Sequence, residues 1–272
     1  MTTQDIVQKL WNLCHVLRDD GITYHQYVTE LTYILFLKMA KETQTQDKLP
    51  EGYRWDDLQA LEGVECLDFY RRLLIELGSH SDTRVQAIYN NAQTALRVPK
   101  NLVTLITEIN KLDWYEARTE GLGDAYEGLL ERNAEEKKSG AGQYFTPRPL
   151  IECMVDLIQP QPGETIQDPA AGTGGFLIQA HNYIKEQTDD LWDLTTEQQE
   201  FQRQQAYIGV ELVPDAHRLG LMNLMLHGID GHLISGDSLS PTGQKLHKVD
   251  IMLTNPPFGS KKGGGLPTRD DF

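Results

Sequence analysis

The second half of the chain alternates short apolar runs with helical stretches, and this alternation constrains the fold more than any other feature. The short runs cover residues 165–167, 206–210, 232–234 and 249–253. Strands that alternate with helices predict βαβ units, which build a parallel sheet with helices packed on it. We therefore expect residues 139–272 to form an α/β domain with a doubly wound, Rossmann-like sheet.

Residues 1–138 have a helical pattern instead. Apolar residues recur at three- and four-residue spacing from Ile6 to Leu17, and between Val28 and Met39 the apolar stripe is wide enough to predict burial on more than one side. Further helices are expected at 57–77, 83–96 and 98–112, which lack β-branched runs. Asp124 and Glu127 have the spacing of a capping box that opens a helix at 125–136. The sequence thus predicts an all-α domain at 1–138, followed by a hinge.

Composition limits the class of protein. The chain has 272 residues, of which 39% are hydrophobic, so it can bury a sizeable core. It contains neither a long apolar run nor the layout of a secretory signal, and we expect a soluble cytoplasmic protein that does not bind a membrane. The formal net charge of -15 is unfavourable for direct binding to phosphates, so an enzyme acting on nucleic acid would need a basic partner.

The three cysteines, Cys14, Cys66 and Cys153, are far apart in the sequence. Their odd number and the lack of a CxxC spacing indicate neither a disulfide framework nor a zinc site. We expect buried free thiols and no metal.

A loop of small residues follows the first predicted strand and precedes a helix predicted at 176–185. The loop contains Asp168, Ala170, Gly172, Thr173, Gly174 and Gly175. Small residues let the backbone turn tightly and approach a ligand, while the N–H groups at the helix start can bind a carboxylate. We predict that this loop binds a nucleotide-type cofactor.

The same loop begins like a dinucleotide-binding fingerprint, because Gly172 and Gly174 form a GxG. However, the third glycine of that fingerprint would fall on Leu177, and no acidic residue ends a strand about 20 residues later. Glu211 ends the second strand instead, after a polar insertion at 188–205. From there its carboxylate can accept hydrogen bonds from both ribose hydroxyls of a cofactor.

A polar loop follows the third predicted strand. Its Asp237 can accept a hydrogen bond from the exocyclic amine of an adenine ring, with Leu239 against the ring. The sequence Gly-Asp-Ser is also a common turn, and that interpretation stays open.

The fourth strand leads into Asn255, Pro256, Pro257 and Phe258. Two successive prolines fix φ and exclude a helix, so the main chain is held rigid. An amine conjugated to a purine is a poor nucleophile, because its lone pair is delocalised into the ring. If the Asn255 side-chain oxygen and the Pro256 carbonyl accept its two hydrogens, the nitrogen pyramidalises and its lone pair can face a methyl sulfonium. Phe258 would then stack on a base rotated out of the duplex.

These motifs resemble those of one family. The segments 168–176 and 255–258 are similar to motifs I and IV of the amino-methyltransferases that act on DNA. An upstream segment resembles motif X, which in that family lies over the methionine end of S-adenosylmethionine. It contains Gln143, Tyr144, Phe145, Thr146, Pro147 and Arg148. The resemblance implies that S-adenosylmethionine is the cofactor. Thr146 and Pro147 also have the residue types of an N-cap and first position for a helix at 148–158.

The first half of the chain narrows this resemblance to a single group within the family. Segments 27–31, 36–38 and 123–130 are similar to the helical domain of the modification subunits of type I restriction-modification systems. This implies a site-specific adenine-N6 DNA methyltransferase subunit that reaches DNA through a specificity subunit and assembles with restriction subunits. Because the sequence stops soon after Phe258, we expect a sheet that is truncated at its C-terminal side.

Other functions stay open at this point. Methylation of cytosine N4, RNA or a protein glutamine can use a similar Asn/Ser-Pro-Pro-aromatic loop. A non-catalytic assembly module is the alternative from a different class. Cytosine C5 methylation is disfavoured, because it needs a nucleophilic cysteine after a proline and none of the three cysteines follows one.

Overall fold

The computed structural model describes residues 3–14, 17, 21–46, 49–112, 114, 122–137 and 146–257. The chain divides into two compact units, Met1–Ser139 and Gly140–Phe272, each of which has its own packing. Within the described part of the chain, none of the helices combines the length and the apolar character needed to cross a membrane.

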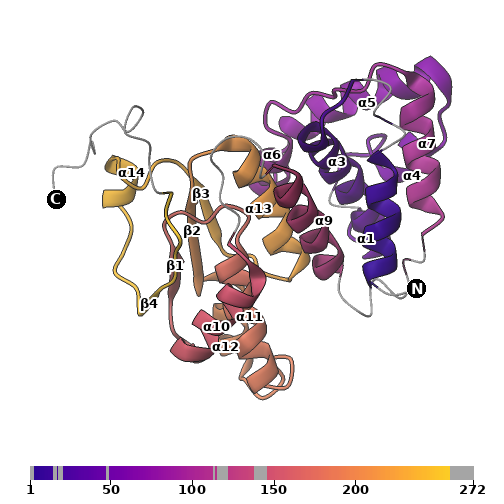
Figure 1. The fold of residues 1–272 in the computed structure, drawn as a ribbon. Coiled ribbons are helices and arrows are strands. Elements are labelled where there is room, and N and C mark those ends of the chain that lie inside the picture. The colour runs from indigo at the N-terminus through magenta and orange to yellow at the C-terminus, as the bar shows by residue number, and fades with distance from the viewer. Residues whose placement is uncertain are drawn as a thin grey trace. The chain divides into compact units, whose positions relative to one another are not determined.

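The first unit is helical where it is described (Figure 1). Its helices are α1 (Thr3–Asn12), α3 (Tyr24–Glu42), α4 (Trp55–Gln59), α5 (Gly63–Gly78), α6 (Thr83–Tyr89), α7 (Pro99–Asn110) and α9 (Leu122–Lys137). Helix α3 contacts α4, α7 and α9, and the consecutive residues Leu31, Thr32 and Tyr33, which project in different directions around it, are all buried. The prediction that this helix is buried on more than one side is confirmed.

Two predicted helices are shorter than expected. The stretch 57–77 divides into α4 and α5 at residues 60–62, and Gly63, the first residue of α5, has a φ of +57°, a conformation that favours glycine. The stretch 83–96 is helical only as far as Tyr89. Beyond it Asn91 has a φ of +53°, and the Ala95 N–H donates to the Glu30 carboxylate rather than to a helical carbonyl. A long-range partner therefore replaces the local helical hydrogen bond.

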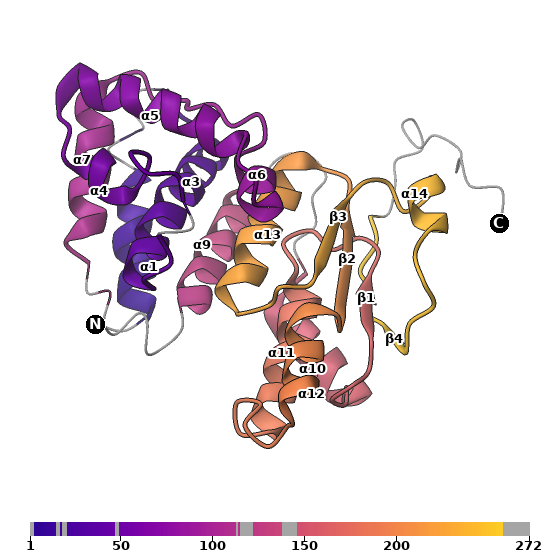
Figure 2. The same cartoon turned by 180° about the vertical axis from the view of Figure 1, so that it is seen from behind.

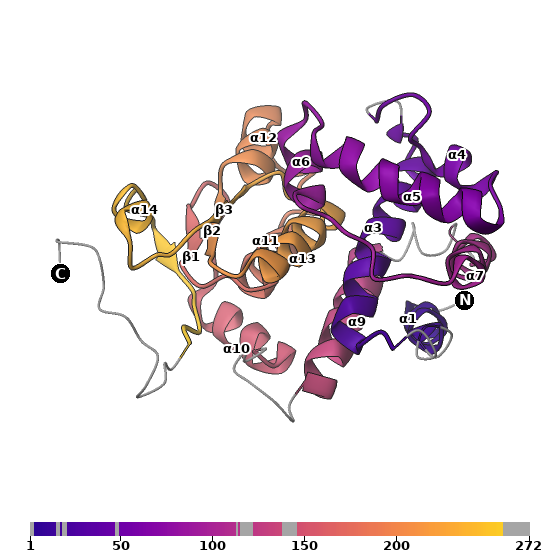
Figure 3. The same cartoon turned by 90° about the horizontal axis from the view of Figure 1, so that it is seen from above.

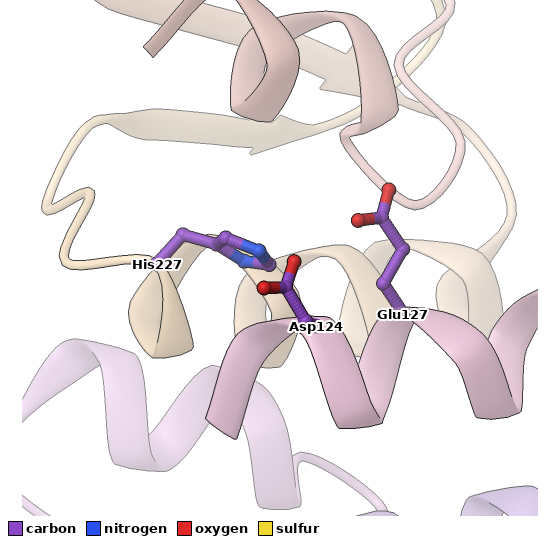
Figure 4. A group of neighbouring side chains, drawn as sticks. All are labelled: Asp124, Glu127 and His227. Atoms are coloured by element: carbon purple, nitrogen blue, oxygen red, sulfur yellow. The ribbon is translucent and has the colours of Figure 1, made fainter. Parts of the chain in front are cut away.

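Helix α9 begins earlier than predicted, at Leu122, so Asp124 lies within its first turn and the predicted helix start at 125 is wrong. A carboxylate in the first turn still stabilises a helix through the macrodipole. Figure 4 shows that Asp124 and Glu127 project in the same direction from α9. Gly128 lets α9 approach α1 closely, because a Cβ at this position would lie 3.0 Å from Val7 Cγ2.

The second unit holds the sheet. Its elements are α10 (Arg148–Ile158), β1 (Ile166–Asp168), α11 (Gly175–Gln187), α12 (Thr196–Gln204), β2 (Tyr207–Glu211), α13 (Pro214–Leu226), β3 (His232–Ser235), α14 (Pro241–Gln244) and β4 (Ile251–Met252). All four predicted strands are present, although β4 is shorter than expected. The polar insertion also contains the unpredicted helix α12, which Thr195 and Gln198 cap reciprocally.

The strand order is β3-β2-β1-β4, and every neighbouring pair is parallel (Figures 1 and 2). Figure 3 shows α11 and α13 on one face of the sheet, and Phe176, Leu177 and Leu224 from these helices are buried in the core. The chain order reverses between β1 and β4. In open parallel sheets, ligands bind at the carboxyl ends of the strands beside such a reversal.

The cysteine prediction is partly wrong. Cys14 and Cys66 are buried free thiols, but Cys153 is exposed on α10. It lies outside the face of α10 that Ile151 and Val155 bury in the core.

Candidate active site

The glycine loop connects β1 to α11 and is fixed by hydrogen bonds of its own backbone. Ala171 N–H donates to the Val210 carbonyl of β2 at 2.9 Å, and Gly174 N–H donates to the Ala171 carbonyl at 2.8 Å. Gly172 and Gly174 have φ values of +55° and +84°, which side chains with a Cβ rarely adopt. The small residues therefore permit this turn, as the sequence predicted.

The loop ends at the start of α11, where Gly174 is the N-cap and no side chain caps the helix. The first N–H groups of a helix have no partner within the helix, and they carry the positive end of its dipole. With no capping side chain, this helix start is suited to an anionic group of a ligand.

Helix α13 supports the loop through two residues that the sequence analysis missed. A Cβ at Gly220 would lie 2.9 Å from the Gly172 carbonyl oxygen, so only glycine fits beneath the loop. Asn223 is fully buried, and its side-chain amide donates to the Thr173 carbonyl at 3.0 Å. The available signal was a polar asparagine within an otherwise apolar stretch of helix.

Glu211 lies at the carboxyl end of β2, as predicted, and contacts the glycine loop. Its Oε2 accepts from Gly172 N–H at 2.8 Å, and its Oε1 accepts from Val213 N–H at 2.7 Å. A carboxylate has about four acceptor sites, so two accepted hydrogen bonds leave capacity for ligand hydroxyls. Glu211 thus links the loop to the strand and remains able to bind a ligand.

Asp168, the last residue of β1, is buried at the start of the same loop. Burial raises the pKa of this carboxyl to about 6, and the nearby Glu211 carboxylate adds to the increase. Ala170 N–H, 3.0 Å from Asp168 Oδ1, acts in the opposite direction. The start of the glycine loop therefore contains a carboxyl group with a pKa of about 6.

The loop after β3 is joined to the loop after β1. The Ser238 hydroxyl donates to the Pro169 carbonyl, and Asp237 Oδ1 accepts from Leu239 N–H at 2.8 Å. Leu239 is 48% exposed, so its apolar side chain is available to a ligand at this edge of the sheet.

Asn255 follows β4, the strand beside β1, and Leu253 N–H extends the pairing by donating to the Gln167 carbonyl at 3.0 Å. The Asn255 side-chain Nδ2 donates to Thr146 Oγ1 at 3.1 Å. Thr146 does not cap α10, because the N-cap is Pro147 and no side chain caps that helix. The predicted cap is therefore wrong, and the Thr146 hydroxyl instead contacts the Asn-Pro-Pro loop.

The remaining predicted residues differ in how far the structure describes them. Pro147, Pro256 and Pro257 are exposed, and Arg148 Nε lies 3.3 Å from Glu152 Oε1 on the next turn of α10. Gln143, Tyr144, Phe145 and Phe258 lie outside the described residues.

Comparisons with known proteins agree with this layout. Residues 117–271 match the N-6 DNA Methylase family, and residues 6–109 match the HsdM N-terminal domain. Two curated relatives are similar over 277 aligned residues, which are 98% of this chain and 52% of each relative. The type I restriction enzyme StySPI methylase subunit of Salmonella potsdam is 52% identical, and the EcoKI methylase subunit of Escherichia coli strain K12 is 51% identical. The chain thus spans about half the length of these relatives.

Solved structures agree as well. The structure is similar to a chain solved in work on complex assembly and conformational transition of the type I restriction-modification system. The TM-score is 0.76 and the sequence identity 27%, over 98% of this chain and 58% of that chain. A type I methyltransferase subunit from Streptococcus thermophilus shares the fold, with a TM-score of 0.71 and 21% identity over 94% and 64% of the two chains. The resemblance to type I modification subunits and the predicted fold class, a helical domain before a parallel α/β sheet, are confirmed. Because the family match runs over residues 117–271, more than half of the sequence, the chain belongs to the N-6 DNA methylase family.

Proposed function

We propose that this chain forms the cofactor- and base-binding part of a site-specific adenine-N6 DNA methyltransferase. The observation that carries the proposal is the position of the polar motifs at one edge of the sheet. Asp168 and Glu211 end β1 and β2, Asp237 follows β3, and Asn255 follows β4. The carboxyl ends of parallel strands beside a reversal of strand order are where such sheets bind ligands.

The residues at this edge fit S-adenosylmethionine. A Cβ at Gly172 would project into open space, with no atom of the described residues within 4 Å, so the glycine leaves room beside the loop. The uncapped start of α11 suits the carboxylate of a methionine, Glu211 suits ribose hydroxyls, and Leu239 offers an apolar surface to an adenine ring. When bound, S-adenosylmethionine supplies an electrophilic methyl group on a sulfonium.

Asn255 and Pro256 act on the target amine. The Asn255 side-chain oxygen and the Pro256 carbonyl accept its two hydrogens, which draws the nitrogen out of conjugation with the purine ring and directs its lone pair outward. The Pro-Pro sequence holds both acceptors in place, since each proline fixes φ. The contribution of these residues is positioning and electrostatic stabilisation.

The proposed activity is tested with the complete protein and a specificity subunit, by measuring transfer of a labelled methyl group to unmethylated DNA. Nucleoside analysis of the product identifies the acceptor atom. We expect N6-methyladenine. N4-methylcytosine as the product, or no transfer under any subunit composition, would contradict the proposal.

Glu211→Ala should weaken binding of S-adenosylmethionine by about 1–3 kcal/mol, because it removes the acceptors proposed for the ribose hydroxyls and releases the Gly172 N–H from its partner. Isothermal titration measures the affinity. Glu186→Ala, which removes an exposed carboxylate at the far end of α11, is the matched control and should bind like the wild type. Equal affinities for Glu211→Ala and the control, or tight binding of NADH without heat from S-adenosylmethionine, would contradict the assignment.

We further propose that the chain reaches DNA through a specificity subunit and assembles with restriction subunits, with the helical unit as an interface and lid rather than a DNA reader. The net charge of -15 predicts that the chain alone binds duplex DNA weakly at physiological salt. Fluorescence anisotropy with labelled duplex, with and without the specificity subunit, measures this. Sub-micromolar affinity of the chain alone would show that it reads DNA itself.

A further inference from the structure

We propose that Asn223, on α13, is a positioning residue that holds the glycine loop in the shape that binds S-adenosylmethionine. This inference rests on the proposed function, and it assigns part of the cofactor affinity to a residue that does not itself contact the cofactor. Asn223 is fully buried, and its side-chain Nδ2 donates to the Thr173 carbonyl at 3.0 Å. The two residues are 50 positions apart in the sequence, so only the folded unit brings them together.

The chemistry of the two groups fixes the direction of this hydrogen bond. A backbone carbonyl can only accept, and of the two ends of an asparagine amide only the nitrogen carries hydrogens. The amide of Asn223 therefore binds Thr173 in one orientation. A residue without a side-chain donor at this position cannot bind the carbonyl.

The hydrogen bond holds one peptide plane of the loop, the plane that joins Thr173 to Gly174. A trans peptide group is planar, so its carbonyl and its N–H point in opposite directions. The carbonyl is bound by Asn223, and the Gly174 N–H donates to the Ala171 carbonyl at 2.8 Å. Both ends of this plane are therefore held, one by α13 and the other by the loop itself.

This peptide plane lies directly before the start of α11. Gly174 is the N-cap of the helix and has a φ of +84°. Since glycine rotates more freely than other residues, the plane before it must be held if the N–H groups after it are to keep one direction. Among the described residues, no acceptor binds the N–H of Gly175 or Phe176, the first two residues of α11. These groups belong to the helix start that suits the carboxylate of the cofactor.

Helix α13 is close enough to make this contact because of Gly220, one turn earlier on the same face. A Cβ at Gly220 would lie 2.9 Å from the Gly172 carbonyl oxygen. The helix is itself held by its packing on β2 and β3. Gly220 and Asn223 therefore form one support, in which the glycine permits the approach and the amide makes the hydrogen bond.

Stability alone does not account for an amide at this position. Among the described residues, the buried Asn223 Oδ1 has no hydrogen-bond partner. A buried acceptor without a partner costs at least as much as one neutral hydrogen bond contributes, so the amide adds little to the stability of the fold. The neighbouring Met222 and Leu224 are buried and apolar. The hydrogen bond to the glycine loop is what an apolar side chain could not supply here.

The test compares two substitutions that both remove the donor but differ in size. Asn223→Leu keeps nearly the volume of the side chain, whereas Asn223→Ala leaves a space. In the complete protein, isothermal titration should show an affinity for S-adenosylmethionine about three- to tenfold weaker in both variants, the effect of one hydrogen bond. Gln202→Leu is the matched control, because it removes another fully buried amide, which donates to the Tyr207 hydroxyl at the amino end of β2. It should bind S-adenosylmethionine like the wild type.

Steady-state kinetics with the specificity subunit separate positioning from a general loss of structure. Both Asn223 variants should raise the KM for S-adenosylmethionine by the factor found in titration, with kcat and the KM for DNA unchanged. A merely structural role would lower kcat through a smaller folded fraction. Wild-type affinity in both variants would overturn the inference. A loss in Asn223→Ala alone would overturn it as well, because it would show that the shape of the side chain matters and the donor does not.

A spectroscopic measurement tests the hydrogen bond itself. Labelling of threonine carbonyls with ¹³C and glycine nitrogens with ¹⁵N selects Thr-Gly peptide groups, which in this chain are Thr173–Gly174 and Thr242–Gly243. The Thr173 signal is identified by its loss in Thr173→Ser. We expect both Asn223 variants to shift it and to leave the Thr242 signal unchanged. An unshifted Thr173 signal would overturn the inference, whereas a wild type that binds no S-adenosylmethionine would overturn the proposed function instead.

Discussion

Asn255→Ala in the complete protein should lower kcat for methyl transfer about a hundredfold or more, because the loss of one positioned acceptor typically costs a few kcal/mol of barrier. The effect should be confined to chemistry. Asn255 follows β4 and is proposed to contact the target amine rather than the methyl donor, whereas the glycine loop and Glu211 are proposed to contact the cofactor. The affinity for S-adenosylmethionine should therefore stay close to that of the wild type. Steady-state methylation and isothermal titration on the same preparations measure the two quantities.

Asn255→Asp is the informative second variant. A carboxylate still accepts hydrogen bonds from the target amine, so the loss of kcat should be smaller than for alanine, although the added charge is unfavourable in a desolvated site. Near-wild-type turnover of Asn255→Ala would mean that the Asn-Pro-Pro loop is only structural. The proposed transfer to an amine would then have to be withdrawn.

The second large effect concerns the stability of the helical unit. Glu30 on α3 is buried, and its carboxylate accepts from the Tyr70 and Thr94 hydroxyls at 3.1 and 3.0 Å and from Ala95 N–H at 2.6 Å. Despite these donors, burial raises the pKa of Glu30 from 4.5 to about 7. The folded state therefore keeps this proton over a pH range in which the unfolded chain has already lost it.

The sign follows from proton linkage. Between pH 4.5 and 7 the folded state binds more protons at Glu30 than the unfolded state, so the contribution of Glu30 to stability falls as the pH rises. The contribution is complete below pH 4.5 and fully lost above pH 7. From pH 5 to pH 8 the wild type should lose about 2–3 kcal/mol relative to Glu30→Gln, which resembles the protonated side chain.

Denaturant unfolding of wild type and Glu30→Gln at pH 5 and pH 8 measures this difference. The difference between the unfolding free energies of the two proteins removes the pH dependence that other buried groups contribute to both. His181, whose pKa is lowered to about 3 by burial, is one of these groups. Glu76→Gln removes an exposed carboxylate from α5 and is the matched control, with no expected pH-dependent difference. A wild type and Glu30→Gln that keep the same stability difference at both pH values would contradict the prediction.

The sequence was sufficient to predict the strands of the sheet and the positions of the polar loops that follow them. The strands at 165–167, 206–210 and 232–234 are close to β1, β2 and β3, because short β-branched and apolar runs between helices are local signals. Glu211 and Asn255 could also be located, since Glu211 ends β2 and Asn255 lies three residues after the end of β4. The direction of parallel strands then brings them to one edge of the sheet.

The sequence was not sufficient where a distant group competes with a local preference. The stretch after Tyr89 has helical composition, yet Ala95 N–H bonds to Glu30, which is 65 residues away. Thr146 has the residue type of a helix cap, yet its hydroxyl accepts from Asn255. In both cases the local hydrogen bond and the long-range one are of similar strength, so the residue type alone does not decide between them.

The sequence by itself therefore determined the helical and α/β parts of the chain, the family and the positions of the segments that are proposed to carry the chemistry. The tertiary structure alone decided which partners those segments have: Gly220 and Asn223 beneath the glycine loop, Gly172 N–H on Glu211, and Thr146 on Asn255. The physical reason is the range of the interactions. Periodicity and turn residues act over a few positions of the chain, whereas these contacts join residues that only the folded sheet brings within hydrogen-bond distance.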